Sequence, residues 1–159
     1  MTTDWPDAVE RVAAYLRAAG AEARIEEFEQ PTPTADDAAK AVGCSLGQIV
    51  KSLVFDCDGA AVVVLVPGDT RASSRKVRGI VGCKRARIAG AEYVEQATGF
   101  TPGAVAPFPL PRVSRVLVDR LLLRHPTVWV GGGSERHLVA VSPAELMRLS
   151  RAEPVDAAG

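Results

Sequence analysis

The 159-residue sequence lacks the features that mark membrane proteins, secreted proteins and disulfide scaffolds. No apolar run approaches the roughly 20 residues that span a bilayer, and Met1–Asp4 has neither the basic nor the apolar region of a signal peptide. The three cysteines are odd in number, lie far apart and form no Cys-x-x-Cys pair. We therefore expect a cytoplasmic protein with reduced thiols and no membrane association.

The common catalytic and cofactor motifs are also missing. His125 and His137 are not spaced to bind one metal ion together, and no cluster of cysteines or acids completes a site. There is no Gly-x-Ser-x-Gly nucleophile elbow and no Gly-Lys-Ser/Thr phosphate loop. The sequence therefore predicts neither a metal ion nor a cofactor.

The formal net charge is zero, but the charges are unevenly distributed. Residues 1–40 hold nine acids against four bases. The later basic excess concentrates in a stretch without acids, which contains Arg71, Arg75, Lys76, Arg78, Lys84, Arg85 and Arg87. Such a stretch is most often a solvated surface, but it also suits contact with a phosphate backbone. No aromatic residue lies within it, so base stacking is not indicated there.

Capping residues and apolar spacing predict several helices. Asp4 can cap a first helix with Pro6 in its first turn and an apolar stripe of Val9, Val12, Ala13 and Leu16, and Gly20 follows as a stop. Further helices are expected from Thr34 to Gly43, from Ser73 or Ser74 to Val81, over residues 91–97, and from Ser142 to Leu149. Proline and glycine break the chain between several of them.

Apolar, β-branched runs predict the strands, at residues 24–28, 49–56, 60–66, 84–88, 115–119, 128–131 and 136–141. Asp58-Gly59 predicts a tight hairpin between the second and third of these. The run 62–66 does not alternate, so that strand should be covered on both faces. Strands and helices are mixed without regular βαβ order, which favours an α+β fold with a mixed, curved, barrel-like β-sheet flanked by helices. We expect one domain over residues 1–159, with a core at about 10–150 and a frayed tail at 151–159.

Lys51 is the most unusual residue of the predicted strands. Alternation places it on the same face as Ile49, Leu53 and Phe55, so its ammonium group needs a partner, a lowered pKa or a route to water. One interpretation is an edge-strand lysine that prevents aggregation, or a lysine whose stem lies on apolar surface with its head in solvent. The other interpretation is a side chain that faces an anionic or carbonyl-bearing ligand.

Two glycine-containing segments also allow both a structural and a functional interpretation. The loop 98–112 is rich in glycine and proline and could point backbone amides into a cleft, although such loops are more often connectors. Gly131–Ser134 is predicted to join two strands, as a tight turn or a close backbone approach. His137 follows this turn and could be a structurally bonded histidine or a functional one.

Three segments in this order and spacing resemble the YbaK/EbsC family, free-standing relatives of the editing insertion domain of bacterial prolyl-tRNA synthetases. They are the run Ile49–Phe55 with Lys51, the segment Thr98-Gly99-Phe100 followed by Gly103-x-x-x-Pro107, and Gly131-Gly132-Gly133 through His137 to Leu146. The resemblance covers about residues 10–150. It implies a single YbaK-like domain that hydrolyses the ester of mischarged aminoacyl-tRNA in trans.

The resemblance also implies a set of site residues. Lys51 and Gly103 would be catalytic, as an anchor and as an oxyanion-binding backbone, and the substrate would contact Ala104, Val105, Pro107, Gly131, Gly132, Gly133 and His137. Arg71, Arg75, Lys76 and Arg78 would contact the tRNA. The sequence departs from the family at Ala104 and Pro109, where many relatives have glycine. These departures concern the identity of the substrate more than the reaction type.

The resemblance predicts an aminoacyl-tRNA deacylase for a small amino acid, most simply Cys- or Ala-tRNA(Pro). Its partners would be aminoacyl-tRNA and prolyl-tRNA synthetase, and its state a monomer or weak homodimer. Two alternatives stay open: a non-catalytic module of the same fold that binds tRNA or the synthetase, and a hydrolase of small esters or aminoacyl adenylates.

Overall fold

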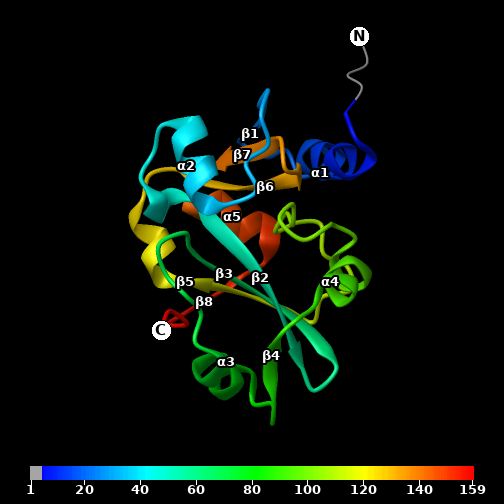
Figure 1. Cartoon of the computed structure of the whole chain (residues 1–159), viewed down its shortest axis with the longest axis vertical. Coiled ribbons are helices and arrows are strands. Elements are labelled where there is room, and N and C mark those ends of the chain that lie inside the picture. Colours follow the sequence, from blue (N-terminus) through cyan, green and yellow to red (C-terminus); the bar gives the residue numbers. More distant parts are fainter. Residues whose placement is uncertain (1–4) are drawn as a thin grey trace.

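The structure, a computed structural model, describes residues 5–159 and combines helices with two β-sheets (Figure 1). In chain order the elements are α1 (Asp7–Ala18), β1 (Ala23–Glu27), α2 (Ala35–Val42), the 3-10 helix η1 (Leu46–Gln48), β2 (Val50–Cys57), β3 (Ala60–Pro67), α3 (Ser74–Val81), β4 (Ala86–Ile88), α4 (Ala91–Thr98), β5 (Arg115–Asp119), the 3-10 helix η2 (Arg120–Arg124), β6 (Val128–Ser134), β7 (His137–Val141), α5 (Pro143–Ser150) and β8 (Glu153–Val155). None of the helices in this described part has the length and apolar character needed to cross a bilayer.

The strands form one five-stranded and one three-stranded sheet. The larger sheet has the order β4-β2-β3-β5-β8, in which β3 is antiparallel to β2 and parallel to β5. The smaller sheet has the order β1-β7-β6 and is antiparallel. The predicted α+β class with mixed strand directions is confirmed, with the strands divided between two sheets where the sequence predicts one curved, barrel-like sheet.

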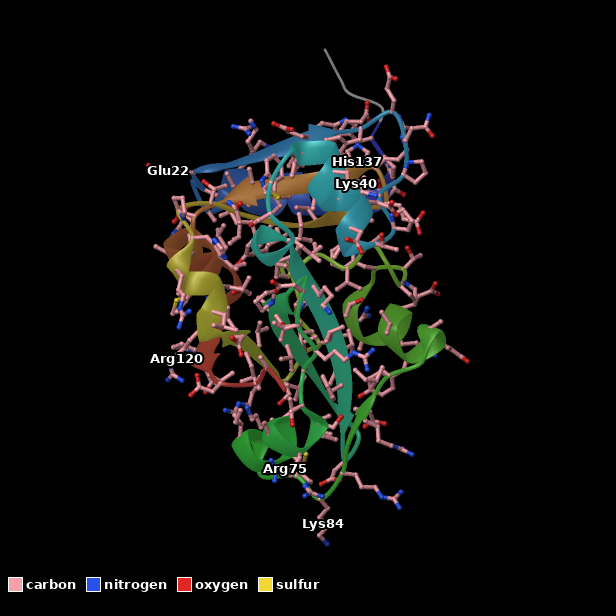
Figure 2. The ribbon with its side chains drawn as sticks, turned by 60° about the vertical axis from the view of Figure 1, so that its left-hand side comes forward. Glu22, Lys40, Arg75, Lys84, Arg120 and His137 are labelled. Atoms are coloured by element: carbon pink, nitrogen blue, oxygen red, sulfur yellow. The ribbon has the colours of Figure 1, made fainter. Side chains whose placement is uncertain are left out.

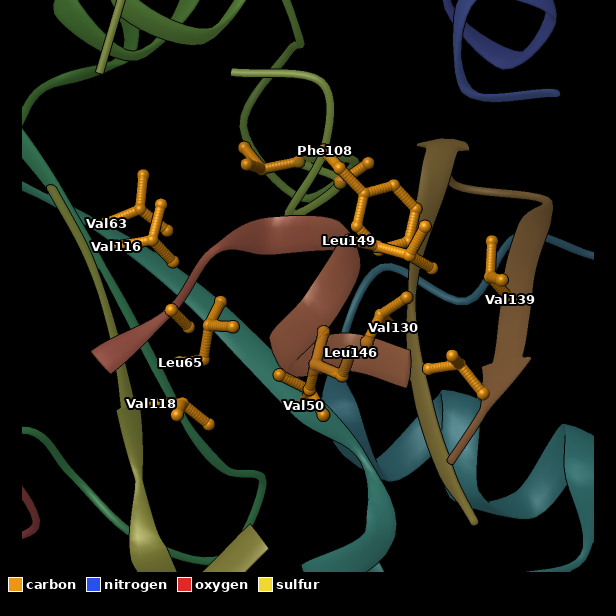
Figure 3. Packing of buried hydrophobic residues seen from close by; sticks show 14 of the residues in the cluster. Val50, Val63, Leu65, Phe108, Val116, Val118, Val130, Val139, Leu146 and Leu149 are labelled. Carbon is orange, nitrogen blue, oxygen red and sulfur yellow. The ribbon is translucent and has the colours of Figure 1, made fainter. Parts of the chain in front are cut away.

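The hairpin of β2 and β3 is the centre of the core. Asp58 and Gly59 both have positive φ, 53° and 93°, as a two-residue hairpin turn requires. Val63 and Leu65 pack into a cluster with β5, β6, β7 and α5, which Figure 3 shows from close by. Val62, Val64 and Val66 pack into a second cluster with Phe55 and Val77. Strand β3 is therefore covered on both faces, as its non-alternating sequence predicts.

Most of the predicted helix ends are confirmed. The side chains of Thr34, Ser73 and Ser142 each accept a hydrogen bond from the backbone N–H three residues later. Helix α1 differs in one detail: Pro6 occupies the N-cap position instead of the first turn, and the predicted cap Asp4 lies outside the described residues. Its apolar stripe is buried as predicted.

Two sequence predictions about the chain's course are wrong. Gly131–Ser134 is the second half of β6, and the chain reverses only at Glu135 and Arg136, because a β-bulge extends the pairing with β7. The C-terminal segment is also ordered against the sheet: β8 pairs with β5, and the buried Asp119 carboxylate accepts the N–H groups of Ala157 and Ala158 at 2.9 and 2.8 Å. That partner lies 38 residues away, so the tail's own composition could not reveal it.

Candidate active site

A pocket of about 390 Å³ lies where strands of the two sheets meet. Its walls come from the segment that leads into α2, from the start of β2, from the loop after α4, and from β6 and β7. The lining residues are Thr32, Pro33, Thr34, Ala35, Ala38, Ile49, Val50, Lys51, Ser52, Leu53, Gly103, Val105, Trp129, Gly131 and Leu138. Figure 1 shows α2 beside β6 and β7, above the first residues of β2. Four segments far apart in the sequence thus share one concave site, the usual setting for ligand binding.

Lys51 lines this pocket from β2 and is half-buried. Its Nζ donates a hydrogen bond to the Thr70 carbonyl, in the turn that follows β3. Partial burial, and next the nearby positive charge of Arg71, lower the pKa of Lys51 below its usual value, while the Asp69 carboxylate opposes this shift. The predicted alternation holds for Leu53 and Phe55, which pack in one cluster, but Ile49 precedes the strand and packs against Trp129 instead. The protein itself therefore supplies a partner for the ammonium group and leaves it at the pocket wall.

The loop after α4 brings Gly103 and Val105 to the same pocket. Gly103 has φ of 84°, in the left-handed region that favours glycine, and we find no acceptor for its N–H within residues 5–159. The Ala104 N–H donates to the Thr101 carbonyl at 3.0 Å, and the Ala104 side chain is buried away from the pocket. Pro107 lines a different cavity. The structure therefore places Gly103 and Val105 in the pocket lining, and Ala104 and Pro107 outside it.

The three glycines of β6 allow close backbone approaches. A Cβ on Gly131 would lie 2.3 Å from the Val105 carbonyl oxygen, so this glycine lets the pocket loop lie against β6. A Cβ on Gly132 or Gly133 would lie 2.8 Å from the carbonyl oxygen of His137 or Ala8, respectively. Of the three, Gly131 lines the pocket, whereas Gly132 and Gly133 serve the packing of β7 and α1.

His137 does not line the pocket. Its Nδ1 lies 2.5 Å from Ser134 Oγ, its Nε2 lies 2.9 Å from Glu27 Oε2, and its ring packs edge-on against Trp5. Alternation along β7 turns the next residue, Leu138, into the pocket instead. The expected pocket-facing position after the glycines is therefore occupied by Leu138, one residue later than the sequence suggested.

The basic stretch divides into two parts. Arg71 is exposed and lies close enough to Lys51 to affect its pKa, whereas Arg75, Lys76 and Arg78 belong to the exposed face of α3. Figure 2 shows Arg75 and Lys84 at the end of the molecule opposite to His137. Lys76 is already engaged, because its Nζ donates to the Ala158 carbonyl at 2.7 Å.

Sequence reasoning missed two features of the pocket. Within the described part of the chain, Ser52 Oγ is the one buried side-chain nitrogen or oxygen without a hydrogen-bond partner, and Ser52 contributes to the pocket wall. The apolar end of the pocket, with Ile49, Trp129 and Leu138, comes from the residue before β2, from β6 and from β7. The position of Ser52 next to Lys51 is a signal that the sequence carries, whereas the apolar wall is visible only in three dimensions. Residues 5–159 contain no group of three or more histidine, cysteine or acidic side chains placed to hold a metal ion.

The fold and the pocket together define a class: an α+β domain with a partly apolar ligand pocket that carries one lysine and a glycine loop. Comparison with known proteins identifies the family within this class. The family model for the aminoacyl-tRNA editing domain matches residues 29–149, so the chain belongs to that family. The resemblance inferred from the three segments is confirmed, and the family that the chain belongs to is named for the editing of aminoacyl-tRNA.

Individual relatives are consistent with this assignment. The uncharacterized protein YwhH of Bacillus subtilis (strain 168) is 35% identical over 127 residues, which cover 79% of this chain and 80% of YwhH. The proline–tRNA ligase of Maridesulfovibrio salexigens is 32% identical over 112 residues, or 70% of this chain, but the match spans only 19% of the ligase. The crystal structure of a candidate trans-editing enzyme for prolyl tRNA synthetase has a TM-score of 0.91 and 36% identity, and covers 98% of this chain and 99% of that one.

Proposed function

We propose that this protein hydrolyses the ester bond of tRNA mischarged with a small amino acid, most simply Ala- or Cys-tRNA(Pro). The observation that carries the proposal is the presence of Lys51 and Gly103 in one pocket, reached from β2 and from the loop after α4. The choice of tRNA(Pro) is supported by the similarity to proline–tRNA ligases and to the candidate trans-editing enzyme.

The residues present suit the chemistry of an activated ester. An aminoacyl ester needs positioning, an oxyanion binder and a placed water more than a strong nucleophile. In the proposed reaction the Gly103 N–H, which has no acceptor of its own among residues 5–159, donates to the ester carbonyl as negative charge develops on oxygen. Lys51 anchors the end of the tRNA at the terminal adenosine, through either the ester carbonyl or the phosphate. The substrate's own hydroxyl or amine assists the water. No side-chain triad is required.

The pocket wall supports the choice of a small side chain. Ala38, Val105 and Leu138 are buried residues of the pocket wall, and buried neighbours in a packed interior resist displacement by a large side chain. Editing is needed in the first place because one methylene is worth only about 1–3 kcal/mol in a synthetase pocket, too little to exclude a smaller or isosteric amino acid.

The exposed bases outside the pocket are the proposed contacts of the tRNA backbone. Arg71 lies near Lys51, and Arg75 and Arg78 are exposed on α3, as a second group of bases farther from the pocket. The ammonium group of Lys76, the fourth predicted contact, also donates a hydrogen bond to the Ala158 carbonyl. Charge reversal at Arg75 and Arg78 should weaken tRNA binding and reduce its dependence on salt, because each lost phosphate contact lowers the slope of log K against log salt by about 0.9 for a duplex. Charge reversal at the exposed Arg17 of α1 is the matched control.

The decisive experiment is single-turnover deacylation of Ala-, Cys- and Ser-tRNA(Pro). Wild type should clear at least one of them, Lys51→Ala should be slower by roughly 100-fold or more, and Lys40→Ala should match wild type. Lys40 is the matched control because it is an exposed lysine on α2 outside the pocket lining. If wild type leaves all three substrates intact while a known deacylase clears them, the proposal fails.

The same assay can also support a second function, that of a tRNA-binding module without turnover. The observation that favours it is the Ala104 N–H, which the Thr101 carbonyl already accepts and which is therefore withheld from a substrate oxygen. Unchanged tRNA affinity with no hydrolysis of any aminoacyl ester would select this function over the deacylase.

A further inference from the structure

A carboxylate lies beside Gly103, a residue of the pocket wall, on a turn that the fold holds in place. Glu135 is in the turn between β6 and β7, and its backbone carbonyl accepts two hydrogen bonds from Thr32, from N at 2.6 Å and from Oγ1 at 3.1 Å. Thr32 is nearly buried and lines the pocket. The next residue, Arg136, exchanges hydrogen bonds with Phe28 through its backbone carbonyl and its guanidinium group. The turn is thus attached to the segment between β1 and α2 at two points, Phe28 and Thr32, of which Thr32 lines the pocket.

Two acceptor oxygens converge beside Gly103. Glu135 Oε1 lies 3.4 Å, and the Pro33 carbonyl oxygen 3.9 Å, from the position that a Cβ on Gly103 would occupy. Glu135 is exposed and, among the residues that the structure describes, makes no ion pair with a basic side chain. A site with one uncommitted carboxylate and one carbonyl oxygen suits a cationic group with several N–H donors.

The proposed substrate carries such a group at the required position. In an aminoacyl ester the α-amino group is two bonds from the carbonyl carbon, and in its ammonium form it has three N–H donors and a positive charge. If the ester carbonyl is held at Gly103, the α-ammonium group is within reach of the oxygens beside that glycine. We propose that Glu135, with the Pro33 carbonyl, binds the α-ammonium group of the aminoacyl moiety. This inference rests on the proposed function and adds a substrate-binding residue to it.

Such a contact has a consequence for selectivity. Glu135 recognises the amino group common to all aminoacyl esters, whereas the apolar wall limits the size of the side chain. The site should therefore prefer a free amino group over an N-acylated one, since acylation removes the positive charge and adds bulk where the two oxygens lie.

The test compares Glu135→Gln with wild type on Ala-tRNA(Pro) and on N-acetyl-Ala-tRNA(Pro). Glu135→Gln should raise KM for the free-amine substrate by about 5- to 20-fold, with a smaller change in kcat, and leave KM for the acetylated substrate unchanged. Glu135→Asp should recover part of the affinity, and Glu29→Gln, at an exposed glutamate outside the pocket lining, should match wild type. Equal KM changes on both substrates, or none on either, would overturn the inference.

Binding measurements separate this inference from the proposed function. A tRNA that carries alanine through a non-hydrolysable amide, with or without its α-amino group, reports affinity without turnover. If wild type hydrolyses nothing, the proposed function fails, while a preference of wild type for the analogue with the amine, lost in Glu135→Gln, still supports the carboxylate site. If wild type is active but binds both analogues equally, the inference about Glu135 fails alone.

Discussion

Gly131→Ala should damage both stability and activity, because this glycine joins the pocket loop to β6. The added methyl group would lie 2.3 Å from the Val105 carbonyl oxygen and 3.1 Å from its carbonyl carbon. Ordinary contact requires at least 3.4 Å, so the loop and the strand must separate by about 1 Å. Both neighbours are backbone, so no side-chain rotation relieves the contact. Overpacking of this kind costs about 1–3 kcal/mol of unfolding free energy.

The effect on the reaction should be larger than the loss of stability suggests. Val105 and Gly103 belong to the same loop, so a 1 Å displacement at Val105 also moves the proposed oxyanion donor. Misplacement by that distance can lower a rate by about 100-fold. Urea denaturation followed by circular dichroism measures the loss of stability, and single-turnover deacylation by the fully folded variant measures the loss of rate.

Gly79→Ala is the matched control. Gly79 lies inside α3 with no heavy atom within 4 Å of the added methyl group, so this substitution should stabilise the protein by about 0.5–1 kcal/mol through better helix propensity. It should leave deacylation unchanged. A Gly131→Ala variant within 0.5 kcal/mol of wild type and equally active would refute the assignment of Gly131 as the contact that positions the loop.

Three further predictions concern charged groups. Asp119→Ala should lower the unfolding free energy by about 3 kcal/mol or more, because three backbone N–H groups lose a buried carboxylate acceptor; a loss below 1 kcal/mol in urea denaturation would contradict this. Lys51 should titrate below 10.5 when followed by NMR at its Cε, and Arg71→Gln should move the midpoint upward, since Arg71 contributes to the lowered pKa. A midpoint that does not change in Arg71→Gln would count against the charge interaction between Arg71 and Lys51. Hydrogen bonds from the Arg148 side chain and then the Glu22 N–H lower the pKa of Glu145 from 4.5 to about 2. The pair of Glu145 and Arg148 therefore stabilises the fold above pH 4.5, and this stabilisation is lost as the pH falls toward 2. In Glu145→Gln the urea midpoint should depend less on pH between pH 4.5 and 2 than in wild type. An unchanged pH dependence would argue against the pair.

Much of the local structure could be predicted because it depends on neighbours in the sequence. The Asp58-Gly59 turn requires two residues that tolerate positive φ, and the helix starts at Thr34 and Ser142 require a side-chain oxygen three residues before a free N–H. Lys51 stood out for the same reason, since alternation alone places its charge on an apolar strand face. The family resemblance then depended on the order of short segments, not on any contact between them.

The errors arose where a distant partner decides the structure. The sequence predicts a frayed tail, but Asp119 and β5 order it, and no property of residues 151–159 points to a partner in β5. The sequence also predicts a turn at the glycines of β6, but the bulge and the pairing with β7 keep them in a strand. The predicted pocket residue His137 is one position out of phase, and a shift of one residue in a strand reverses which side chain faces the pocket.

The sequence by itself therefore determined the fold class, most helix and strand positions, the family, and Lys51 as the residue of most interest. Only the tertiary structure decided which side chains share the pocket: Ser52 and Leu138 line it, His137 does not, and Glu135 lies beside Gly103 although 32 positions separate them in the sequence. The physical reason is that capping, turns and alternation act over a few residues, whereas a pocket is formed by the packing of segments that meet only after the two sheets have assembled.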